Sequence, residues 1–144
     1  LFNERSKSTI QTLISYLKRR EARVVFEKNF HASIASDSDI DLNAYAFATF
    51  EVLDASYDLL ISVGGDGTIL RAITFVKDLE IPIVGINTGR LGFLATIPMN
   101  TVQEAMDEIF EGNYRISKRS LLTIEVDAKN TSLDLDFALN EIAH

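Results

Sequence analysis

The segment from residue 59 to residue 86 constrains the fold of this chain more than any other part of it. Residues 59–63 form a continuous apolar run, as expected of a buried parallel strand. A glycine-rich turn follows, and residues 68–79 then place apolar side chains at helical spacing. Residues 81–86 are a second apolar run. Strand, turn, helix and strand within about 30 residues predict a βαβ unit with two parallel strands.

The turn inside this unit reads Gly64-Gly65-Asp66-Gly67-Thr68. Glycine lets a ligand approach the backbone closely, and N–H groups at a helix N-terminus attract phosphate. An acid in such a cradle would hold a metal ion or take a proton from an attacking hydroxyl. Ligands of parallel sheets bind beyond the carboxyl ends of the strands, where this turn and residues 87–93 both fall. The turn therefore predicts nucleotide binding or phosphoryl transfer.

The flanking sequence predicts the other elements of an α/β fold. Before the βαβ unit we expect a helix around residues 10–17 with Ser6 or Ser8 as its cap, and a short strand at residues 23–27. Residues 29–41 are polar and predict a loop, and residues 42–53 predict a second helix.

Beyond Pro98 the spacing of the apolar residues changes. Residues 102–110 predict an amphipathic helix, and the alternating residues 122–126 and 133–139 predict two antiparallel strands. We therefore expect a Rossmann-like, parallel-sheet α/β nucleotide-binding domain over residues 1–99. A linking helix and the first strands of an incomplete β-rich domain follow over residues 100–144. Both ends look cut, and we expect the chain to be part of a longer protein.

Three blocks together resemble the NAD kinase family. They are the Gly64–Thr68 turn, the Asn87–Leu94 stretch with the sequence NTGRLGFL, and the pair Asn140-Glu141. Diacylglycerol kinases, sphingosine kinases and 6-phosphofructokinases share a GGDG-type turn, whereas the other two blocks are similar to NAD kinases in particular. The resemblance covers residues 59–144 well, and residues 1–58 fit it only in pattern.

The resemblance implies a role for each matching residue. Asp66 would be the catalytic base that activates the adenosine-ribose 2′-hydroxyl of NAD for attack on the γ-phosphate of ATP. The turn residues Gly65, Gly67 and Thr68 would contact phosphate through their backbone. Asn140 and Glu141 would hydrogen-bond the NAD substrate, which offers ribose hydroxyls to an amide and a carboxylate. Phe93 would line the adenine pocket.

Several of these residues have a simpler interpretation. Arg71, one helical turn beyond Gly67, could neutralise a phosphate, but it could equally be a solvated helix cation. Phe93 could be a core residue, because aromatic side chains usually are. The Asn140-Glu141 pair could be an ordinary strand end. No residue is assigned as a metal ligand.

The implied reaction converts ATP and NAD to ADP and NADP, with Mg²⁺ bridging the phosphates. A lipid kinase of the diacylglycerol kinase type and a non-catalytic nucleotide-binding fragment are the alternatives. The formal charge of −7 argues against a nucleic-acid-binding face and, mildly, against a membrane-facing lipid kinase. We expect a cytoplasmic protein that binds small-molecule nucleotides, and the resemblance implies a homodimer or homotetramer. The sequence leaves open whether ATP or polyphosphate is the donor and whether NADH is accepted.

Overall fold

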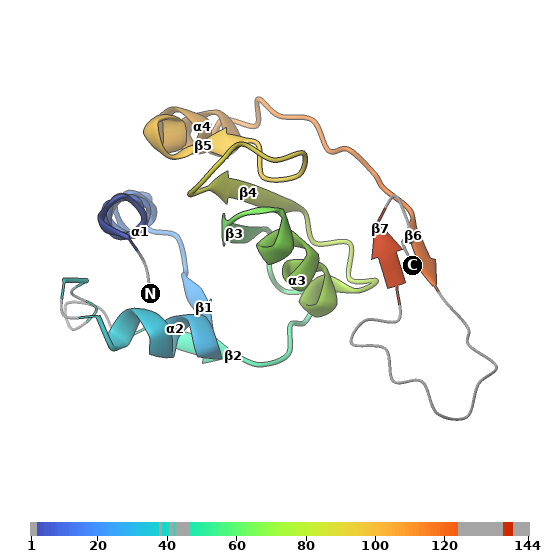
Figure 1. Cartoon of the computed structure of the whole chain (residues 1–144), viewed down its shortest axis with the longest axis horizontal. Coiled ribbons are helices and arrows are strands. Elements are labelled where there is room, and N and C mark those ends of the chain that lie inside the picture. Colours follow the sequence, from blue (N-terminus) through green and yellow to red (C-terminus); the bar gives the residue numbers. More distant parts are fainter. Residues whose placement is uncertain (1–2, 38, 41, 43–46, 124–136, 140–144) are drawn as a thin grey trace. The chain divides into compact units, whose positions relative to one another are not determined.

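The computed structural model describes residues 3–37, 39–40, 42, 47–123 and 137–139 (Figure 1). Contacts between residues group the chain into two compact units, Leu1–Tyr114 and Arg115–His144. We describe each unit by itself. The predicted division after residue 99 falls earlier than this boundary, and the helix that follows it belongs to the first unit by its contacts.

The predicted βαβ unit is present. Strand β3 (Leu60–Gly64), helix α3 (Asp66–Val76) and strand β4 (Ile83–Asn87) follow one another, and the two strands pair in parallel. A short strand, β5 (Ile97–Pro98), extends the sheet on the other side of β4, again in parallel. This strand was not predicted, because two residues are too few for a recognisable pattern.

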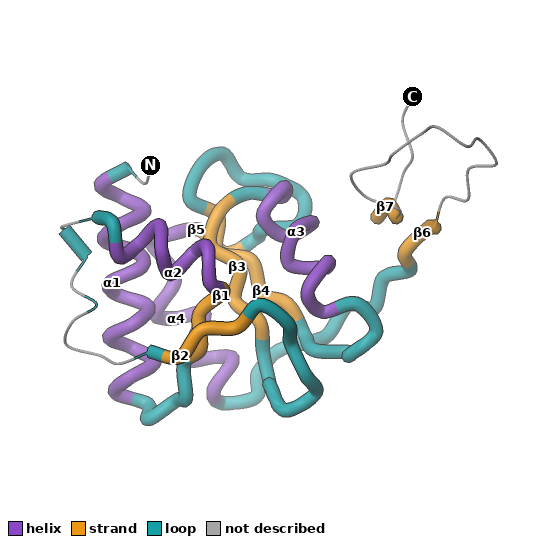
Figure 2. The backbone as a smooth tube through the Cα atoms, turned by 90° about the horizontal axis from the view of Figure 1, so that it is seen from below, coloured by secondary structure: helices purple, strands orange, loops and turns teal. Residues whose placement is uncertain are grey.

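Helices cover both faces of this sheet (Figure 2). One face packs against α1 (Glu4–Arg19) and α4 (Val102–Phe110), and a 3₁₀ turn (Met99–Thr101) leads into α4. The other face packs against α3. The buried cluster that joins α1, α4 and β4 consists of Leu13, Tyr16, Leu17, Ile86, Val102 and Met106. This layering, with helices on both sides of a parallel sheet, confirms the predicted α/β class.

Helix α1 begins earlier than predicted. Its N-cap is Asn3, whose side-chain oxygen accepts a hydrogen bond from the Ser6 N–H at 2.8 Å. The predicted cap, Ser6 or Ser8, is therefore wrong. Asparagine is as good a cap as serine, so residue preference alone could not choose between them.

Two predictions for residues 29–53 are also wrong. Most of the predicted loop is a helix, α2 (Lys28–Ala35), which begins where the Glu27 carboxylate accepts the N–H groups of the next residues. Part of the predicted helix is a strand instead, β2 (Ala48–Phe50). It pairs in parallel with β1 (Val25–Glu27) and buries Phe50. Strand pairing overrode the helical spacing of this segment.

The second unit contains a two-stranded antiparallel sheet. Strand β6 (Leu121–Thr123) pairs with β7 (Phe137–Leu139), so that Leu121 faces Leu139. Both strands fall within the segments predicted to be strands or directly beside them. Asn140 and Glu141 lie outside the described residues.

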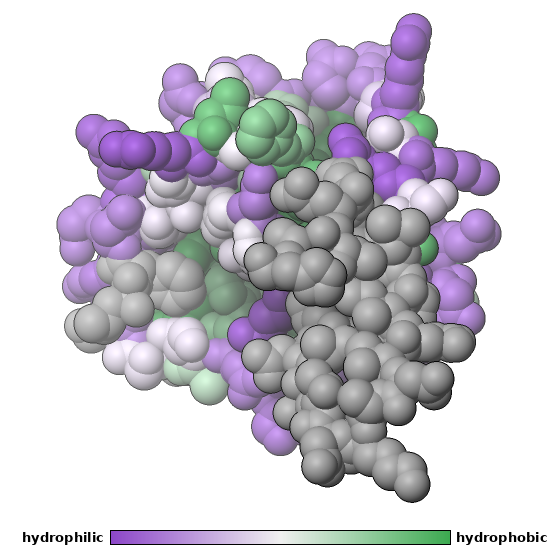
Figure 3. All heavy atoms as spheres, turned by 45° about the vertical axis from the view of Figure 1, so that its right-hand side comes forward, coloured by the Kyte–Doolittle hydropathy of each residue, from purple (hydrophilic) through white to green (hydrophobic). Residues whose placement is uncertain are grey.

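Hydrophilic side chains surround smaller hydrophobic areas on the face shown in Figure 3. None of the helices that the structure describes is both long enough and apolar enough to cross a bilayer.

Candidate functional site

The two glycine-containing blocks meet at the carboxyl edge of the β3–β4 sheet. In the parallel register Gly64 lies opposite Asn87, the last residue of β4. Beyond this pair the Thr88 N–H donates a hydrogen bond to the Gly64 carbonyl at 3.1 Å. The structure therefore brings the turn and the loop after β4 together, where parallel sheets bind their ligands.

The carboxylate of Asp66 is bonded to this loop by three backbone groups. Asp66 is the first residue of α3. Its Oδ2 accepts the Phe93 N–H at 2.9 Å, and its Oδ1 accepts the N–H groups of Leu94 and Ala95 at 3.0 Å each. These bonds, led by that from Ala95, hold the pKa of the Asp66 carboxyl below its usual range, because they favour the charged form. Asp66 is thus an ionised group that also fixes the position of the loop.

Gly92 makes this arrangement possible. A Cβ atom on Gly92 would lie 2.6 Å from Cγ and 2.7 Å from Oδ2 of Asp66, distances that no real side chain tolerates. No role was predicted for Gly92. The only signal in the sequence was its place within the NTGRLGFL block.

The glycines of the turn differ in what surrounds them. Gly64 has a φ of +157°, and a Cβ there would come within 2.9 Å of the Thr68 Cβ. Gly65 and Gly67 have open space beside them, since nothing lies within 4 Å of a Cβ built at either residue. The backbone next to Asp66 is therefore accessible to a ligand.

Asn87 holds the same loop from the side of the sheet. Its side chain is buried, with 3% of its surface exposed, and its amide donates to the carbonyl groups of Arg90 at 2.8 Å and Ala95 at 3.3 Å. Its Oδ1 accepts the Gly89 N–H at 2.8 Å. Asn87 belongs to the NTGRLGFL block, but its positioning role was not predicted, because that role depends on burial of the amide.

Phe93 and Arg71, two further predicted site residues, lie in different places. Phe93 is 92% exposed, so the interpretation of Phe93 as a core residue is wrong. Arg71 is exposed on α3, and its Nη2 lies 3.9 Å from Oε2 of Glu27. The structure brings Phe93 to the Asp66 site, but it places Arg71 beside β1. Asn140 and Glu141 fall outside the described residues.

Within the described part of the chain there is no group of three or more histidine, aspartate or glutamate side chains placed to hold a metal ion.

The chain is similar to a known protein family. A family model described as the ATP-NAD kinase N-terminal domain matches residues 2–114. An NAD kinase from Christiangramia forsetii is 44% identical over 137 residues, which are 93% of this chain and 46% of that protein. An NAD kinase from Flavobacterium psychrophilum is 42% identical over 134 residues, which are 92% of this chain and 46% of that protein. The chain spans about half the length of the curated relatives it matches.

One solved structure shares the fold. It is described as yeast NADH kinase complexed with NADH, and it superposes with a TM-score of 0.63 over 93% of this chain and 41% of that one. Its sequence identity is 19%, so this similarity concerns the fold alone.

Proposed function

Since this chain belongs to the ATP-NAD kinase family, we propose that the protein carrying it transfers the γ-phosphoryl group of ATP to the adenosine-ribose 2′-hydroxyl of NAD. The observation that carries this proposal is the ionised Asp66 carboxylate, held at a glycine turn whose backbone is open to a ligand. NAD kinase relatives with this much identity support the choice of acceptor.

Asp66 retains one hydrogen-bonding position for the acceptor hydroxyl. A carboxylate offers about four lone-pair sites. The Oδ1 atom accepts two backbone N–H groups, whereas Oδ2 accepts one, from Phe93. We assign the remaining site on Oδ2 to the 2′-hydroxyl, which Asp66 would orient and whose proton it would take.

The low pKa of Asp66 suits this role. A carboxylate with a depressed pKa is always ionised at neutral pH but is a weak proton acceptor. Phosphoryl transfer through a loose transition state depends mainly on positioning and electrostatics, and little on proton removal before attack. Asp66 would therefore accept the proton as the new oxygen–phosphorus bond forms and the bond from phosphorus to the ADP oxygen breaks.

We assign phosphate contacts to the first turn of α3. The N–H groups of Thr68 and Ile69 donate to the Gly65 carbonyl at 3.0 and 3.3 Å. Asp66 and Gly67 are the first two residues of α3, whose N–H groups have no carbonyl partner within the helix, and there is open space beside Gly65 and Gly67. We assign these two N–H groups to a phosphate oxygen. When bound, Mg²⁺ would be held by the phosphates and would neutralise part of their charge.

The remaining roles also belong to the proposal. The exposed ring of Phe93 would stack against the adenine of the acceptor, since an exposed aromatic face beside a nucleotide site offers such contact. Asn140 and Glu141 would hydrogen-bond NAD, and Arg71 would have to leave Glu27 to reach a phosphate.

We further propose a cytoplasmic enzyme that assembles as a homodimer or homotetramer.

A product assay tests this function against the lipid kinase alternative, which none of the comparisons supports. The full-length protein is incubated with ATP labelled in the γ-phosphoryl group and with either NAD or diacylglycerol. We expect labelled NADP and no labelled lipid. Labelled lipid, or no labelled NADP, would contradict the proposal.

A further inference from the structure

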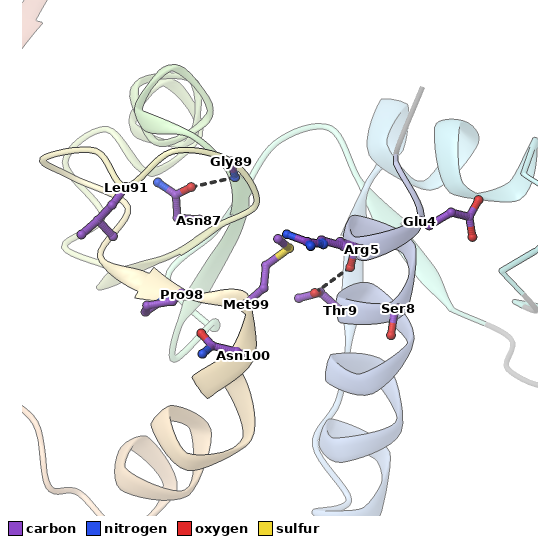
Figure 4. Close-up of a pocket in the computed structure, with 10 residues that line it drawn as sticks. All are labelled: Glu4, Arg5, Ser8, Thr9, Asn87, Gly89, Leu91, Pro98, Met99 and Asn100. Carbon is purple, nitrogen blue, oxygen red and sulfur yellow. Dashed lines mark hydrogen bonds between the residues drawn. The ribbon is translucent and has the colours of Figure 1, made fainter.

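The loop of residues 88–95 is held from two sides by the side chains of Asn87 and Asp66. Asn87 makes three hydrogen bonds to the loop backbone, and Asp66 accepts three more. The bonds of Asn87 reach Gly89 and Arg90 at the start of the loop and Ala95 at its end. Figure 4 shows the bond between the Asn87 amide and Gly89. One buried amide therefore joins the two ends of this loop.

Ala95 is the residue at which the two side chains meet. Its N–H donates to Oδ1 of Asp66 at 3.0 Å, and its carbonyl accepts from Nδ2 of Asn87 at 3.3 Å. Ala95 is buried, and a Cβ built on Gly85 of β4 would lie 2.8 Å from the Ala95 Cα. Such close packing leaves a backbone segment little freedom to shift. The placement of Ala95 by β4 and by Asn87 therefore determines where its N–H meets the Asp66 carboxylate.

An asparagine suits position 87 because its side chain both donates and accepts. Nδ2 donates to the carbonyl groups of Arg90 and Ala95, while Oδ1 accepts the Gly89 N–H. An aspartate could keep the bond from Gly89, but it would turn a second oxygen towards the two carbonyl oxygens. A buried polar network whose members are paired favours one arrangement over others. The Asn87 amide therefore selects one conformation of the loop.

We propose that Asn87 is a positioning residue for phosphoryl transfer, which acts through Ala95 to set the orientation of the Asp66 carboxylate. Three N–H groups of the loop determine how this carboxylate is turned, and hence where the remaining site on Oδ2 points. A small displacement of a reacting group lowers the rate strongly. This role of Asn87 rests on the proposed function, because it concerns the carboxylate to which the acceptor hydroxyl is assigned.

The test uses the full-length protein and two variants, Asn87→Ala and Asn87→Asp. Asn87→Ala removes all three bonds. Asn87 lines a pocket of about 750 Å³ between α1 and the loop (Figure 4), so water can reach the three polar groups that this variant leaves unpaired. Asn87→Asp keeps the acceptor for the Gly89 N–H and removes both donors. Either variant alone suffices if the other does not fold.

We expect each variant to lower kcat about 10-fold to 100-fold, since Asp66 is displaced from the acceptor hydroxyl. The Kd of NAD, measured by calorimetry, should change less than about threefold, because the orientation of Asp66 matters more in the transition state than in the bound complex. Asn100→Ala is the control. It removes an exposed asparagine that lines the same pocket from the 3₁₀ turn, and it should change neither quantity.

A double-mutant cycle separates positioning from a general loss of structure. In an Asp66→Ala background no carboxylate is left to orient, so Asn87→Ala should lower the residual kcat less than about twofold. Losses that multiply in the double variant would overturn the inference. An unchanged kcat in the single variants, or a loss of NAD affinity as large as the loss of kcat, would do the same. A wild-type protein that makes no NADP would instead refute the proposed function.

Discussion

At the scale of single residues, the Asp66 carboxylate both fixes the position of a loop and has its pKa lowered by the same contacts. Its three backbone hydrogen bonds fix the loop of residues 93–95, and the same bonds set its pKa. The sequence predicted the acid and the turn, because glycines around an aspartate are visible in the motif. It could not predict the contacts to the loop, since those depend on how β4 is aligned with β3. The position of the loop and the chemistry of the acid are therefore coupled.

Replacing Asp66 by asparagine should strongly reduce turnover but leave NAD binding measurable. The amide nitrogen would face the Phe93 N–H in place of Oδ2, so the variant loses both that bond and the acceptor for the hydroxyl. We expect kcat to fall roughly 10²–10⁴-fold, the usual contribution of a general base. Steady-state kinetics and calorimetry with NAD measure the two effects. Asp78→Asn, just beyond the other end of α3, serves as the control, and a near-normal kcat for Asp66→Asn would disprove the assignment.

Gly92→Ala should reduce kcat by acting on Asp66. The added methyl group would collide with the carboxylate and displace it, and a small misplacement of a catalytic group costs up to about 100-fold in rate. A double-mutant cycle checks this mechanism. In an Asp66→Ala background the carboxylate is gone and the methyl group has room, so Gly92→Ala should cost little more. Additive losses in the double variant would show that Gly92 acts independently of Asp66.

The contribution of Asp66 to stability should depend on pH. Because its pKa is lowered in the folded protein, its hydrogen bonds stabilise the fold fully above the ordinary aspartate value, about 3.9. The stabilisation is lost as the pH falls through the lower folded value. Denaturant unfolding should therefore show a constant difference between wild type and Asp66→Asn from pH 7 to pH 5. The difference should shrink below about pH 4, and one that already disappears between pH 7 and pH 5 would contradict the lowered pKa.

At the scale of elements, a helix or strand was predictable where local apolar spacing determines it. It was missed where capping or pairing with a distant strand determines it. The β3–α3–β4 unit was predictable because its apolar runs match buried strands on both sides of a glycine turn. Helix α2 was missed because its N-cap is Glu27, a residue type that rarely caps helices, and because Ile34 is its one fully buried side chain. Strand β2 was missed because pairing with β1 decides its structure, and pairing is not encoded in local spacing.

The contact between α1 and α4 explains why α4 belongs to the first unit. Tyr16 is buried, and its hydroxyl donates to Oδ1 of Asp107 on α4 at 2.5 Å. Burial and this acceptor raise the pKa of Tyr16. Tyr16→Phe should lower the free energy of unfolding by about 1.5 kcal/mol, the lower end of the usual contribution of a hydrogen bond to a charged group, because the Asp107 side chain is half exposed.

Chemical denaturation of the wild type, of Tyr16→Phe and of a control variant measures this effect. Tyr57→Phe is the control, since the Tyr57 hydroxyl has no hydrogen-bond partner among the described residues. Equal stability of Tyr16→Phe and wild type would mean that the bond does not help to join the two helices.

At the scale of the whole molecule, the residues that we assign to the substrates are found along the sequence of both units. The turn with Asp66 and the loop with Phe93 lie in the first unit, whereas Asn140 and Glu141 belong by sequence to the second. The comparisons match the first unit to one named domain, over residues 2–114. The division after residue 99, which follows from the change in apolar spacing beyond Pro98, stays a prediction. The grouping by contacts ends at Tyr114 because α4 packs on α1, a long-range contact that local spacing does not encode.

The 144-residue chain alone should therefore bind NAD more weakly than the full-length protein and should show no turnover. The chain spans 46% of the length of its NAD kinase relatives from Christiangramia and Flavobacterium, and a protein of their length has about as much sequence again from which to contact its substrates. Positioning two nucleotides around one carboxylate requires contacts on both, and each lost contact lowers the fraction of productive complexes. Calorimetry with NAD and an NADP assay, run on both polypeptides, measure these effects. Circular dichroism must first show that the shorter chain is folded. Equal rates for the two polypeptides would mean that the residues of this chain carry the whole reaction, and would contradict this prediction.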